Sequence, residues 1–337
     1  MKKIIAVILV CALGLVMLAG CGKSNDSTAG SGSAAAQNTG TQSSGSENTS
    51  GSSSQPAGSP QSEASQPAAQ AATQVAATTL GFSGLISVVT REEGSGTRDA
   101  VRDLFGIKDA DGKENVTEEA MVQDSTGSMM TAVAGDPNAI GYCSLASLNE
   151  TVKAVSIDGV EATPANVKNG SYKIQRPFYL ATMGEASGLA KDFIEFILSA
   201  EGQTAATKRC IPVDDSPPKY TGNAPAGRIV VGGSSSVSPV MEDLIKAYKE
   251  VNPNAEIELQ TSDSSKGMTD AKSGAYDIGM ASRELKDAEK DDGLIPIFIA
   301  IDGIAVIVNS ANPTQNLTIE QVRSIYNGEF EDWSDIK

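Results

Sequence analysis

The stretch from Arg91 to Arg98, which reads Arg-Glu-Glu-Gly-Ser-Gly-Thr-Arg, has the residue types that bind an anion. An apolar run at 85–90 precedes it and a helix-like pattern at 97–106 follows it, so we predict a strand, a tight glycine loop and a helix start. The N–H groups of a first helical turn have no partner inside the helix, and the helix dipole adds positive charge there. The two arginines supply forked, charged donors. The stretch could therefore hold an oxyanion.

The same residues also fit an ordinary strand-to-helix turn with a Ser or Thr cap, and the stretch alone does not choose between the two. No Gly-Lys-Ser/Thr follows, so it is not a Walker-type phosphate loop, and the glycines around Ser95 do not have the spacing of a nucleophile elbow. The chain contains no histidine. A hydrolase that used Ser95 or Ser235 as its nucleophile would lack an evident base, so we expect no enzyme activity, no metal and no cofactor.

Three other predicted strands also end in loops that carry hydroxyl side chains. These are Ser235 and Ser236 after 229–232, Ser264 after 256–260, and Ser282 after 277–280. Each loop alone could be a helix cap, which is the commonest use of Ser at such positions. Ligand sites of open α/β sheets lie at the carboxyl ends of strands, however, so such loops can meet at one site. Together with the stretch 91–98, they predict one small oxyanion held by many hydrogen bonds.

Strand and helix patterns alternate from Leu80 onward, which predicts an α/β body. The expected strands lie at 85–90, 139–144, 153–157, 178–182, 229–232, 256–260, 277–280, 296–301 and 303–309. The expected helices lie at 97–106, 126–134, 187–200, 202–208, 238–251, 265–273 and 318–327. A Pro- and Gly-rich segment at 214–228 is predicted to be a connector.

The 337-residue chain is acidic, with 42 Asp and Glu against 26 Lys and Arg and a net charge of −16. Domains that bind nucleic acid present a basic face, so we expect no nucleic acid partner. A bound anion must then be held by local dipoles and a few arginines, against the field of the whole protein.

The first 20 positions have the form of a signal peptide, with Lys2 and Lys3 followed by an apolar run at 4–19. The run is short for a membrane span. It leads into Leu-Ala-Gly-Cys, which resembles the bacterial lipobox and implies cleavage before Cys21 and lipidation of its thiol. An uncleaved anchor helix is the alternative. In both cases we expect a protein tethered to the cell membrane, with its body on the extracellular (extracytoplasmic) face.

Positions 21–79 are rich in Ser, Gly and Ala and contain almost no large apolar residue. Such a segment cannot bury enough surface to fold, so we expect a lipid-anchored disordered linker. The folded body is then expected to begin near Leu80.

Two cysteines, Cys143 and Cys210, belong to the body. One disulfide between them is an option, but Cys143 lies in a strand-like context and Cys210 lies beyond a helix. We therefore prefer two small buried thiols.

Several motifs of the body together resemble the phosphate-binding protein of bacterial phosphate ABC importers. They are Gly-Ser-Ser-Ser-Val-Ser-Pro at 233–239, Asp-Ile-Gly-Met-Ala-Ser-Arg-Glu-Leu at 277–285, Asp-Gly-Ile-Ala-Val-Ile-Val-Asn at 302–309, the segment from Leu317 to Trp333, and the stretches Arg91 to Thr97 and Ala139 to Tyr142. The resemblance covers essentially all of 85–337. It implies a two-lobed, periplasmic-binding-protein-like α/β fold of type II, with a two-strand hinge that closes on the anion.

The resemblance also implies a function. A monomeric, lipid-anchored receptor would bind inorganic phosphate between its lobes and deliver it to the membrane subunits of an ABC permease. Two alternatives use the same scaffold: a receptor for another oxyanion, such as sulfate or molybdate, and a surface phosphate sensor without a transport role.

The order of the motifs departs from the family pattern. In the family, the Gly-Ser-Ser-Ser loop comes first and the Trp segment continues into the Arg-Glu-Glu-Gly-Ser-Gly-Thr segment. Here Trp333 lies near the last residue and Arg91 lies near the start of the body. We expect a circular permutation in which the connector 214–228 joins the old ends, with a fragment of a tandem pair as the alternative. The expected lobes are 81–176 with 303–337 and, continuous in sequence, 177–302.

By position in the family motifs, the resemblance implies a set of direct phosphate contacts. They are Arg91, Ser95, Gly96, Thr97, Ser235, Ser236, Ser264 and Ser282. Glu93 or Glu92 would pair with Arg91 and fix its fork, and we prefer Glu93 because we expect Glu92 to be solvated. Arg98 and Arg283 are expected to be helix-start and lobe-surface charges, with direct contact to the ligand as the alternative.

Phosphate keeps a proton near neutral pH and sulfate does not, so selection of phosphate needs a hydrogen-bond acceptor that would repel sulfate. Some family members carry an aspartate at the position of Ser282, where this chain has serine. We therefore assign the acceptor role to Asp302, just before the predicted hinge glycine. Its other candidate role is a hydrogen bond that caps or holds the hinge.

Overall fold

The computed structural model describes residues 82–214 and 216–336. The expected signal peptide (1–20), the expected lipidation site Cys21 and the expected linker (21–79) lie outside these described residues. All described residues belong to one unit of the chain, Ala71–Lys337. Among them, the helices are too short or too polar to cross a membrane.

The strands of the body fall into two groups that follow each other along the chain, and one long strand is shared. The first group is β1 (Ser87–Arg91), β2 (Met121–Gln123), β3 (Ala139–Ser144), β4 (Val152–Ala154) and β5 (Ser156–Ile157). The second group is β6 (Gln175–Met183), β7 (Ile211–Pro212), β8 (Gly227–Ser234), β9 (Ala255–Ser262) and β10 (Ile278–Ala281). The shared strand is β11 (Leu294–Asn309), and β12 (Asn316–Leu317) follows it.

Helices connect and cover these strands. They are α1 (Gly96–Phe105), α2 (Thr126–Gly135), α3 (Pro164–Lys168), α4 (Gly188–Ile197), α5 (Ala200–Ala206), α6 (Ser238–Val251), α7 (Ser264–Ser273), α8 (Asp287–Asp291) and α9 (Ile319–Tyr326), with a 3-10 turn at Trp333–Asp335. The helix α6 buries Val240, Leu244 and Tyr248, which recur every four residues and so form one apolar face. The helix α1 begins at the N-cap Ser95 and ends at Gly106 in the left-handed conformation.

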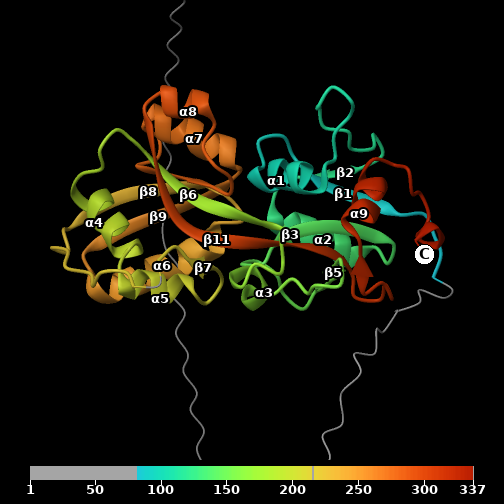
Figure 1. Ribbon diagram of the computed structural model, residues 1–337. Coiled ribbons are helices and arrows are strands. Elements are labelled where there is room, and N and C mark those ends of the chain that lie inside the picture. The colour runs from blue at the N-terminus through green and yellow to red at the C-terminus, as the bar shows by residue number, and fades with distance from the viewer. Residues whose placement is uncertain (1–81, 215, 337) are drawn as a thin grey trace, which may run out of the picture. The chain divides into compact units, whose positions relative to one another are not determined.

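The antiparallel strands β6 and β11 run from one group of elements to the other (Figure 1). The strand order is β2-β1-β3-β11-β6-β10-β8-β9, so these two strands stand at its centre. On one side β1 pairs in parallel with β2 and β3, and on the other side β8 pairs in parallel with β9 and β10. The predicted α/β fold, with two lobes joined by a two-strand hinge, is confirmed.

Each lobe has a hydrophobic core of its own. Along β6 and its approach, Ile174 belongs to the first core and Phe178 belongs to the second. Along β11, Ile304 belongs to the first core and Ala300 to the second. The exact lobe boundaries, expected after 176 and after 302, stay predictions. Below, lobe one denotes the elements around the first core and lobe two those around the second.

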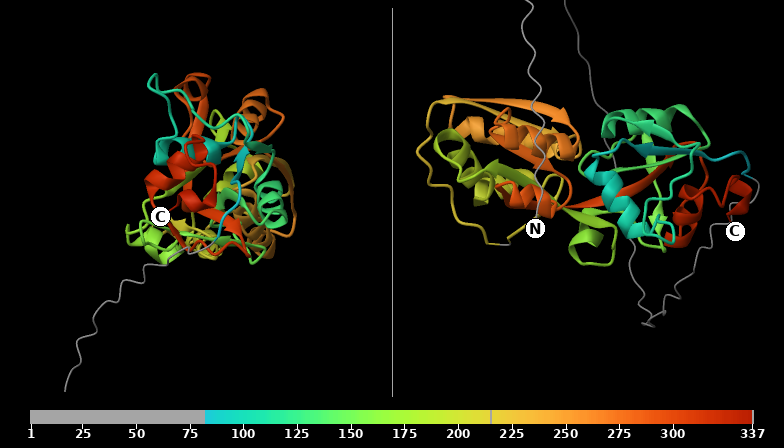
Figure 2. Two further views of the ribbon diagram at one scale, coloured as in Figure 1. Left: turned by 90° about the vertical axis from the view of Figure 1, so that its right-hand side faces the viewer. Right: turned by 90° about the horizontal axis from the view of Figure 1, so that it is seen from above.

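The first and last described segments of the body lie side by side (Figure 2). The Ile86 N–H donates to Glu331 O at 2.7 Å, and the Trp333 N–H donates to Gly84 O at 3.1 Å. The Trp333 ring is buried, and its Nε1–H donates to Asn138 O at 2.9 Å. These contacts join the start of β1 to the segment that follows α9, so lobe one depends on both ends of the body.

The short elements β2, α3 and α8 were not predicted from the sequence, since each has five residues or fewer. Two strands predicted at 296–301 and 303–309 are one continuous strand, β11. Gly303 lies inside this strand and does not interrupt it. The lack of a side chain at Gly303 instead allows β11 to pack closely against Leu145 of lobe one. A Cβ atom added there would lie 2.4 Å from Leu145 Cδ1.

Candidate functional site

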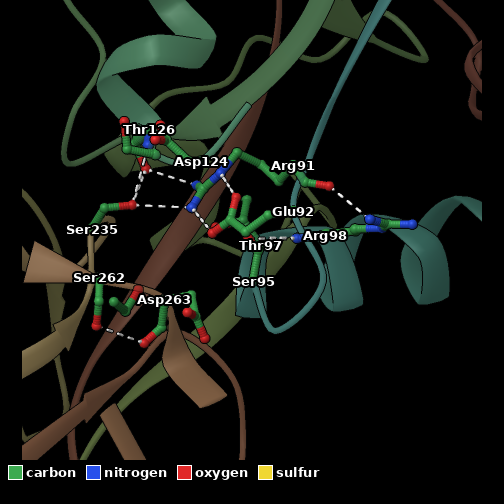
Figure 3. A network of polar contacts seen from close by, with 12 residues as sticks. Arg91, Glu92, Ser95, Thr97, Arg98, Asp124, Thr126, Ser235, Ser262 and Asp263 are labelled. Atoms are coloured by element: carbon green, nitrogen blue, oxygen red, sulfur yellow. Dashed lines mark hydrogen bonds and ion pairs between the residues drawn. The ribbon is translucent and has the colours of Figure 1, made fainter. Parts of the chain in front are cut away.

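A buried group of polar side chains lies where the two lobes meet (Figure 3). Lobe one contributes Arg91 from the end of β1, Thr97 from the first turn of α1 and Thr126 from the start of α2. Lobe two contributes Ser235 and Ser236 from the loop between β8 and α6. These five residues, here called the cleft cluster, are each at most 7% exposed. All of them except Thr126 were predicted from the sequence.

Hydroxyl groups of the cleft cluster join the lobes directly. Thr97 Oγ1 lies 2.9 Å from Ser236 Oγ. Thr126 Oγ1 lies 3.1 Å from both Ser235 Oγ and Ser236 Oγ. The Thr126 N–H and Arg91 Nη2 both donate to Ser235 Oγ, at 3.1 and 3.2 Å. The lobes are therefore closed on each other at this point.

Arg91 is held by its neighbour in the chain. Its Nε and Nη2 atoms each donate to a carboxylate oxygen of Glu92 at 2.7 Å, and its Nη1 donates to Thr126 Oγ1 at 3.2 Å. The expected pairing with Glu93 is wrong, because Glu93 is exposed in the following turn. Glu92 still pairs with β2 through its N–H, which donates to Gln123 O at 3.0 Å, and this keeps its side chain beside Arg91.

The loop before α1 approaches lobe two closely. Gly94 has a φ angle of 91°, in the region that favours glycine, and a Cβ atom there would lie 2.6 Å from Asp263 Oδ1. Ser95 is the N-cap of α1, and its Oγ accepts from the Arg98 N–H at 3.3 Å. The Ser95 hydroxyl therefore caps the helix, although it is buried beside the cleft cluster.

Gly96 touches the remaining two predicted serines. A Cβ atom added to Gly96 would lie 2.6 Å from Ser264 Oγ and 2.8 Å from Ser282 Oγ. These two serines also contact each other, because the Ser282 N–H donates to Ser264 Oγ at 3.1 Å. The four loops singled out in the sequence thus converge on one place, and only a residue without a side chain fits between them.

Asp302 lies one step further from the cleft, behind Arg176. Its Oδ2 accepts from Arg176 Nε and Nη2 at 3.3 and 3.2 Å, and its Oδ1 accepts from Ser144 Oγ at 2.9 Å and the Ala146 N–H at 3.3 Å. Arg176 Nη1 in turn donates to Ser282 Oγ at 3.2 Å. Both oxygens of Asp302 already hold donors. Asp302 thus makes hinge hydrogen bonds, which we gave as its other candidate role, and it is Arg176 that contacts Ser282.

Burial and charge set the ionisation of this pair. Burial raises the pKa of Asp302 to about 6, although the charge of Arg176 acts in the opposite direction. Burial lowers the pKa of Arg176, Asp302 raises it, and the charge of Arg91 lowers it again. The two arginines thus repel each other across the site, and each is neutralised by one carboxylate, Glu92 or Asp302. An anion placed between the arginines would relieve this repulsion.

Four helices begin at the site. They are α1 at Gly96, α2 at Thr126, α6 at Ser238 and α7 at Ser264. Each brings first-turn N–H groups without partners in the helix and the positive end of a helix dipole. Such ends bind anions without a net positive charge, which suits a protein with a net charge of −16.

The hydroxyl groups at the site are arranged as donors. Ser235 Oγ accepts two N–H groups, Ser264 Oγ accepts one from Ser282, and Ser282 Oγ accepts one from Arg176. A hydroxyl that already accepts N–H bonds has its own hydrogen left to donate. The carboxylates of Glu92 and Asp302 are occupied by arginines. The arrangement therefore presents hydrogen-bond donors from both lobes, which is the chemistry that a small oxyanion requires.

Two further arginines lie near the site and pair with carboxylates, and the expectation that Arg283 is a lobe-surface charge is wrong, because Arg283 is only 7% exposed. Arg98 pairs with Glu114 and donates through Nη1 to Arg91 O at 2.8 Å. Arg283 of lobe two pairs with Glu289 and lies 3.5 Å from Asp99 of α1. The contact between Arg283 and Asp99 holds the lobes together beside the site. A backbone hydrogen bond does the same, in which the Ser265 N–H donates to Gly94 O at 3.1 Å.

The cysteines of the body are two free buried thiols, as we preferred from the sequence. Burial raises the pKa of both Cys143 and Cys210, so neither is a reactive thiolate. In the part of the chain that the structure describes, His, Cys, Asp and Glu side chains form no group of three or more that could hold a metal.

Thr126 and Arg176 are the site residues that sequence reasoning missed. Thr126 follows Ser125 at a predicted helix start, so it had the same hydroxyl signal as the other loops, but the three-residue strand before it was not recognised. Arg176 precedes Pro177 at the predicted crossing between lobes. An arginine at a hinge crossing was a signal that a partner lay on the opposite strand.

Comparisons with known proteins agree with this fold. A family model described as a PBP superfamily domain matches residues 69–201 and 218–337. The chain is 47% identical over 259 residues to the phosphate-binding protein PstS 2 of Streptococcus agalactiae serotype V, covering 75% of this chain and 88% of the relative. It is 42% identical over 268 residues to PstS 2 of Streptococcus pneumoniae serotype 4, covering 78% of this chain and 92% of the relative.

Among solved structures, the chain is similar to the phosphate-binding protein of a phosphate ABC transporter from Streptococcus pneumoniae TIGR4. The two are 41% identical, with a TM-score of 0.60 that covers 75% of this chain and 100% of the other. Sequence identity, coverage and structural similarity thus point to the same group of proteins. The chain therefore belongs to the PBP superfamily and, within it, to the family of the PstS phosphate-binding proteins.

Proposed function

We propose that this protein binds inorganic phosphate between its two lobes and delivers it to an ABC permease for import. The observation that carries the proposal is the buried set of hydroxyl, arginine and helix-start donors that the two lobes share. Relatives of 47% and 42% identity are named phosphate-binding proteins, which supports phosphate as the ligand. The role is that of a solute receptor, without a chemical step.

The proposed phosphate contacts come from both lobes. They are Arg91, Gly96, Thr97 and Thr126 from lobe one, and Ser235, Ser236, Ser264 and Ser282 from lobe two. Ser95 supports this site as the cap of α1, and Glu92 holds Arg91 in place. Since neither lobe supplies all the donors, the complete site exists only when the lobes are closed. Phosphate binding is therefore expected to stabilise the closed arrangement.

Calorimetric titration of the purified protein with phosphate, sulfate and molybdate tests this function. We expect phosphate to bind with a dissociation constant in the micromolar range or tighter. We also expect phosphate to stabilise the closed arrangement, which small-angle scattering would detect as a more compact protein. The donor-rich site favours a second candidate, a receptor for an oxyanion without a proton. A clear preference for sulfate or molybdate would establish that candidate and reject phosphate import.

We also propose that the protein acts as a monomer at the extracytoplasmic face of the cell membrane, anchored through lipid on Cys21. The Leu-Ala-Gly-Cys motif after the apolar run supports this anchor. Replacing Cys21 by Ser should release the protein from membranes into the soluble fraction. Retention of the C21S protein in the membrane fraction would indicate an uncleaved anchor helix instead.

The order of the elements is proposed to be a circular permutation of the family pattern. The adjacency of the two ends of the body supports it, because Ile86 and Trp333 hydrogen bond to the opposite end. The experiment is a chain that links the last residue to residue 82 by a short Gly/Ser segment and opens within 214–228. We expect this chain to fold and to bind phosphate with an affinity within about threefold, since permutation is tolerated where ends meet at the surface. An unfolded product would argue against the permuted order.

A further inference from the structure

Arg176 and Asp302 face each other across the two hinge strands. They are direct partners in the register of β6 and β11, and their side chains are 2% and 0% exposed. A fully buried ion pair is seldom a net source of stability, because removing both charges from water offsets their attraction. The position of this pair at the hinge, beside the cleft, therefore suggests a role beyond holding the fold together.

The pair lies in a continuous chain of contacts from one lobe to the other. On the lobe-one side, Asp302 Oδ1 accepts from Ser144 Oγ and from the Ala146 N–H. On the lobe-two side, Arg176 Nη1 donates to Ser282 Oγ, which borders Gly96 at the start of α1. The guanidinium group of Arg176 is thus one hydroxyl away from the proposed phosphate position.

The contact with Arg176 also fixes what Ser282 can do. Because Ser282 Oγ accepts from Arg176, its hydrogen is free to be donated toward Ser264 and the cleft. Across the site, Arg91 is close enough for its charge to disfavour the charge on Arg176. An anion bound beside Ser282 would therefore interact with both positive charges.

We propose that Arg176 is a second cationic residue of the anion site, which acts through Ser282 and by its charge, and that Asp302 balances this charge while the site is empty. The inference rests on the proposed phosphate-binding function and adds a residue to it. Arg176 is in this sense a positioning residue. Phosphate and Asp302 are then two alternative sources of negative charge for one guanidinium group.

This arrangement predicts effects of opposite sign for the two partners. Removing the Arg176 charge removes a favourable interaction with phosphate, so affinity falls. Removing the Asp302 charge leaves Arg176 without compensation in the empty protein, and a bound anion supplies what is missing, so affinity rises. A purely structural pair would instead lower affinity in both variants, because either change would disturb the hinge in the same way.

The experiment is calorimetric titration of the purified full-length protein and its variants with inorganic phosphate. We expect Arg176→Gln to weaken binding about 10- to 100-fold, the range for a hydrogen bond that involves a charged group. Arg176→Lys should recover part of this loss, because it keeps the charge but not the fork. Asp302→Asn should bind phosphate at least as tightly as the wild type.

Two further variants separate charge from folding. In the double variant Arg176→Gln/Asp302→Asn, two amides replace the ion pair without a buried net charge, and its affinity should be as low as that of Arg176→Gln alone. Arg209→Gln is the control, since Arg209 also donates to a backbone oxygen near the hinge, Ala146 O, but has its own carboxylate partner, Asp243. Its affinity should stay within about threefold of the wild type.

Wild-type affinity in the double variant, or equal losses in Arg176→Gln and Asp302→Asn, would overturn the role of Arg176 and leave phosphate binding intact. Failure of the wild type itself to bind phosphate would overturn the proposed function and this inference with it. If Asp302→Asn is too unstable for titration, the rise in melting temperature on adding phosphate decides. This rise should be larger than in the wild type, and a smaller rise would count against the proposal.

Discussion

Arg91 pairs with the residue that follows it in the chain, whereas Arg176 pairs with a residue 126 positions away. In the first pair, the side chains of Arg91 and Glu92 are 3% and 21% exposed, so water reaches the carboxylate. In the second pair, the side chains are 2% and 0% exposed. The comparison shows two ways to keep a buried arginine paired in an acidic protein. One partner is local and can be replaced by water, and the other is remote and cannot.

The exposure of the carboxylate also decides the energetics of each pair. A partly solvated ion pair contributes about 0–1 kcal/mol, because water screens it and can take the place of either partner. Removal of one member of a fully buried pair costs about 3–5 kcal/mol, because the remaining charge has no solvent. We therefore expect the local pair to be important for the ligand and the remote pair to be important for the ligand and the fold together.

The largest effect on binding is expected from Arg91→Gln, which tests whether the local pair is the main charge of the site. Arg91 contacts hydroxyls of both lobes, at Thr126 and Ser235, so its loss removes charge and two interlobe bonds. Phosphate affinity measured by calorimetry should fall by at least about a hundredfold, from two charge-assisted hydrogen bonds of about 1.5–3 kcal/mol each. Arg102→Gln, an arginine of α1 that pairs with Asp99 and Asp103, is the control. Similar losses in both variants would mean that a diffuse positive field, and not Arg91 itself, attracts the anion.

Gly96→Ala should have the next largest effect, because Gly96 packs against Ser282, the serine that Arg176 contacts. The added Cβ would meet Ser264 Oγ at 2.6 Å and Ser282 Oγ at 2.8 Å only when the lobes are closed. We expect about tenfold weaker phosphate binding and less compaction in small-angle scattering, while the melting temperature of the empty protein stays unchanged or rises, since Ala favours a helix. Gly127→Ala, in the first turn of α2, is the matched control, because an added Cβ there would come no closer than 4.0 Å to a neighbour, Ser125 Oγ. Unchanged affinity in G96A would show that the lobes need not approach this closely.

The remote pair should also make stability depend on pH. Burial raises the pKa of Asp302 to about 6, above its value in an unfolded chain, so the folded state holds this proton more tightly. The stabilising contribution is therefore complete below the unfolded pKa and is lost as pH rises through about 6. Between pH 4 and 6.5, the free energy of unfolding of the empty protein, measured with denaturant, should fall by about 1 kcal/mol per pH unit. The Asp302→Asn variant should lack this fall. Equal slopes in the two proteins would place the titrating group elsewhere.

Glu92→Gln should have the smallest effect, because Glu92 belongs to the local, partly solvated pair and not to the remote, buried one. Gln can still accept from Arg91, and water reaches the position, so we expect a loss of stability below about 1 kcal/mol. Phosphate affinity should change by no more than about threefold, because the removed negative charge lies on the solvent side of Arg91. Glu93→Gln is the control and should change neither quantity, since Glu93 is exposed. A loss of affinity close to that of Arg91→Gln would show that Glu92 is indispensable for holding the guanidinium.

Much of the site could be predicted from the sequence because its parts are local. A strand end, a glycine or serine loop and a helix start are adjacent in the chain, and their hydrogen-bonding chemistry follows from the residue types. The prediction therefore found Arg91, Gly96, Thr97 and the four serines Ser235, Ser236, Ser264 and Ser282. It failed where the choice depended on direction, as at Glu92 and Glu93, since a residue's place along the chain does not tell which of two neighbours continues the strand.

By itself, the sequence determined the α/β class, the place of the glycine- and serine-bearing loops and the lack of histidine, because each follows from residue types at short spacing. Only the tertiary structure decided which groups face each other across the hinge. Arg176 and Asp302 meet because β6 and β11 pair antiparallel in a particular register, and that register is set by the packing of two cores and not by any local pattern. The same register places Asp302 behind Arg176, and not in the cleft as the sequence had suggested.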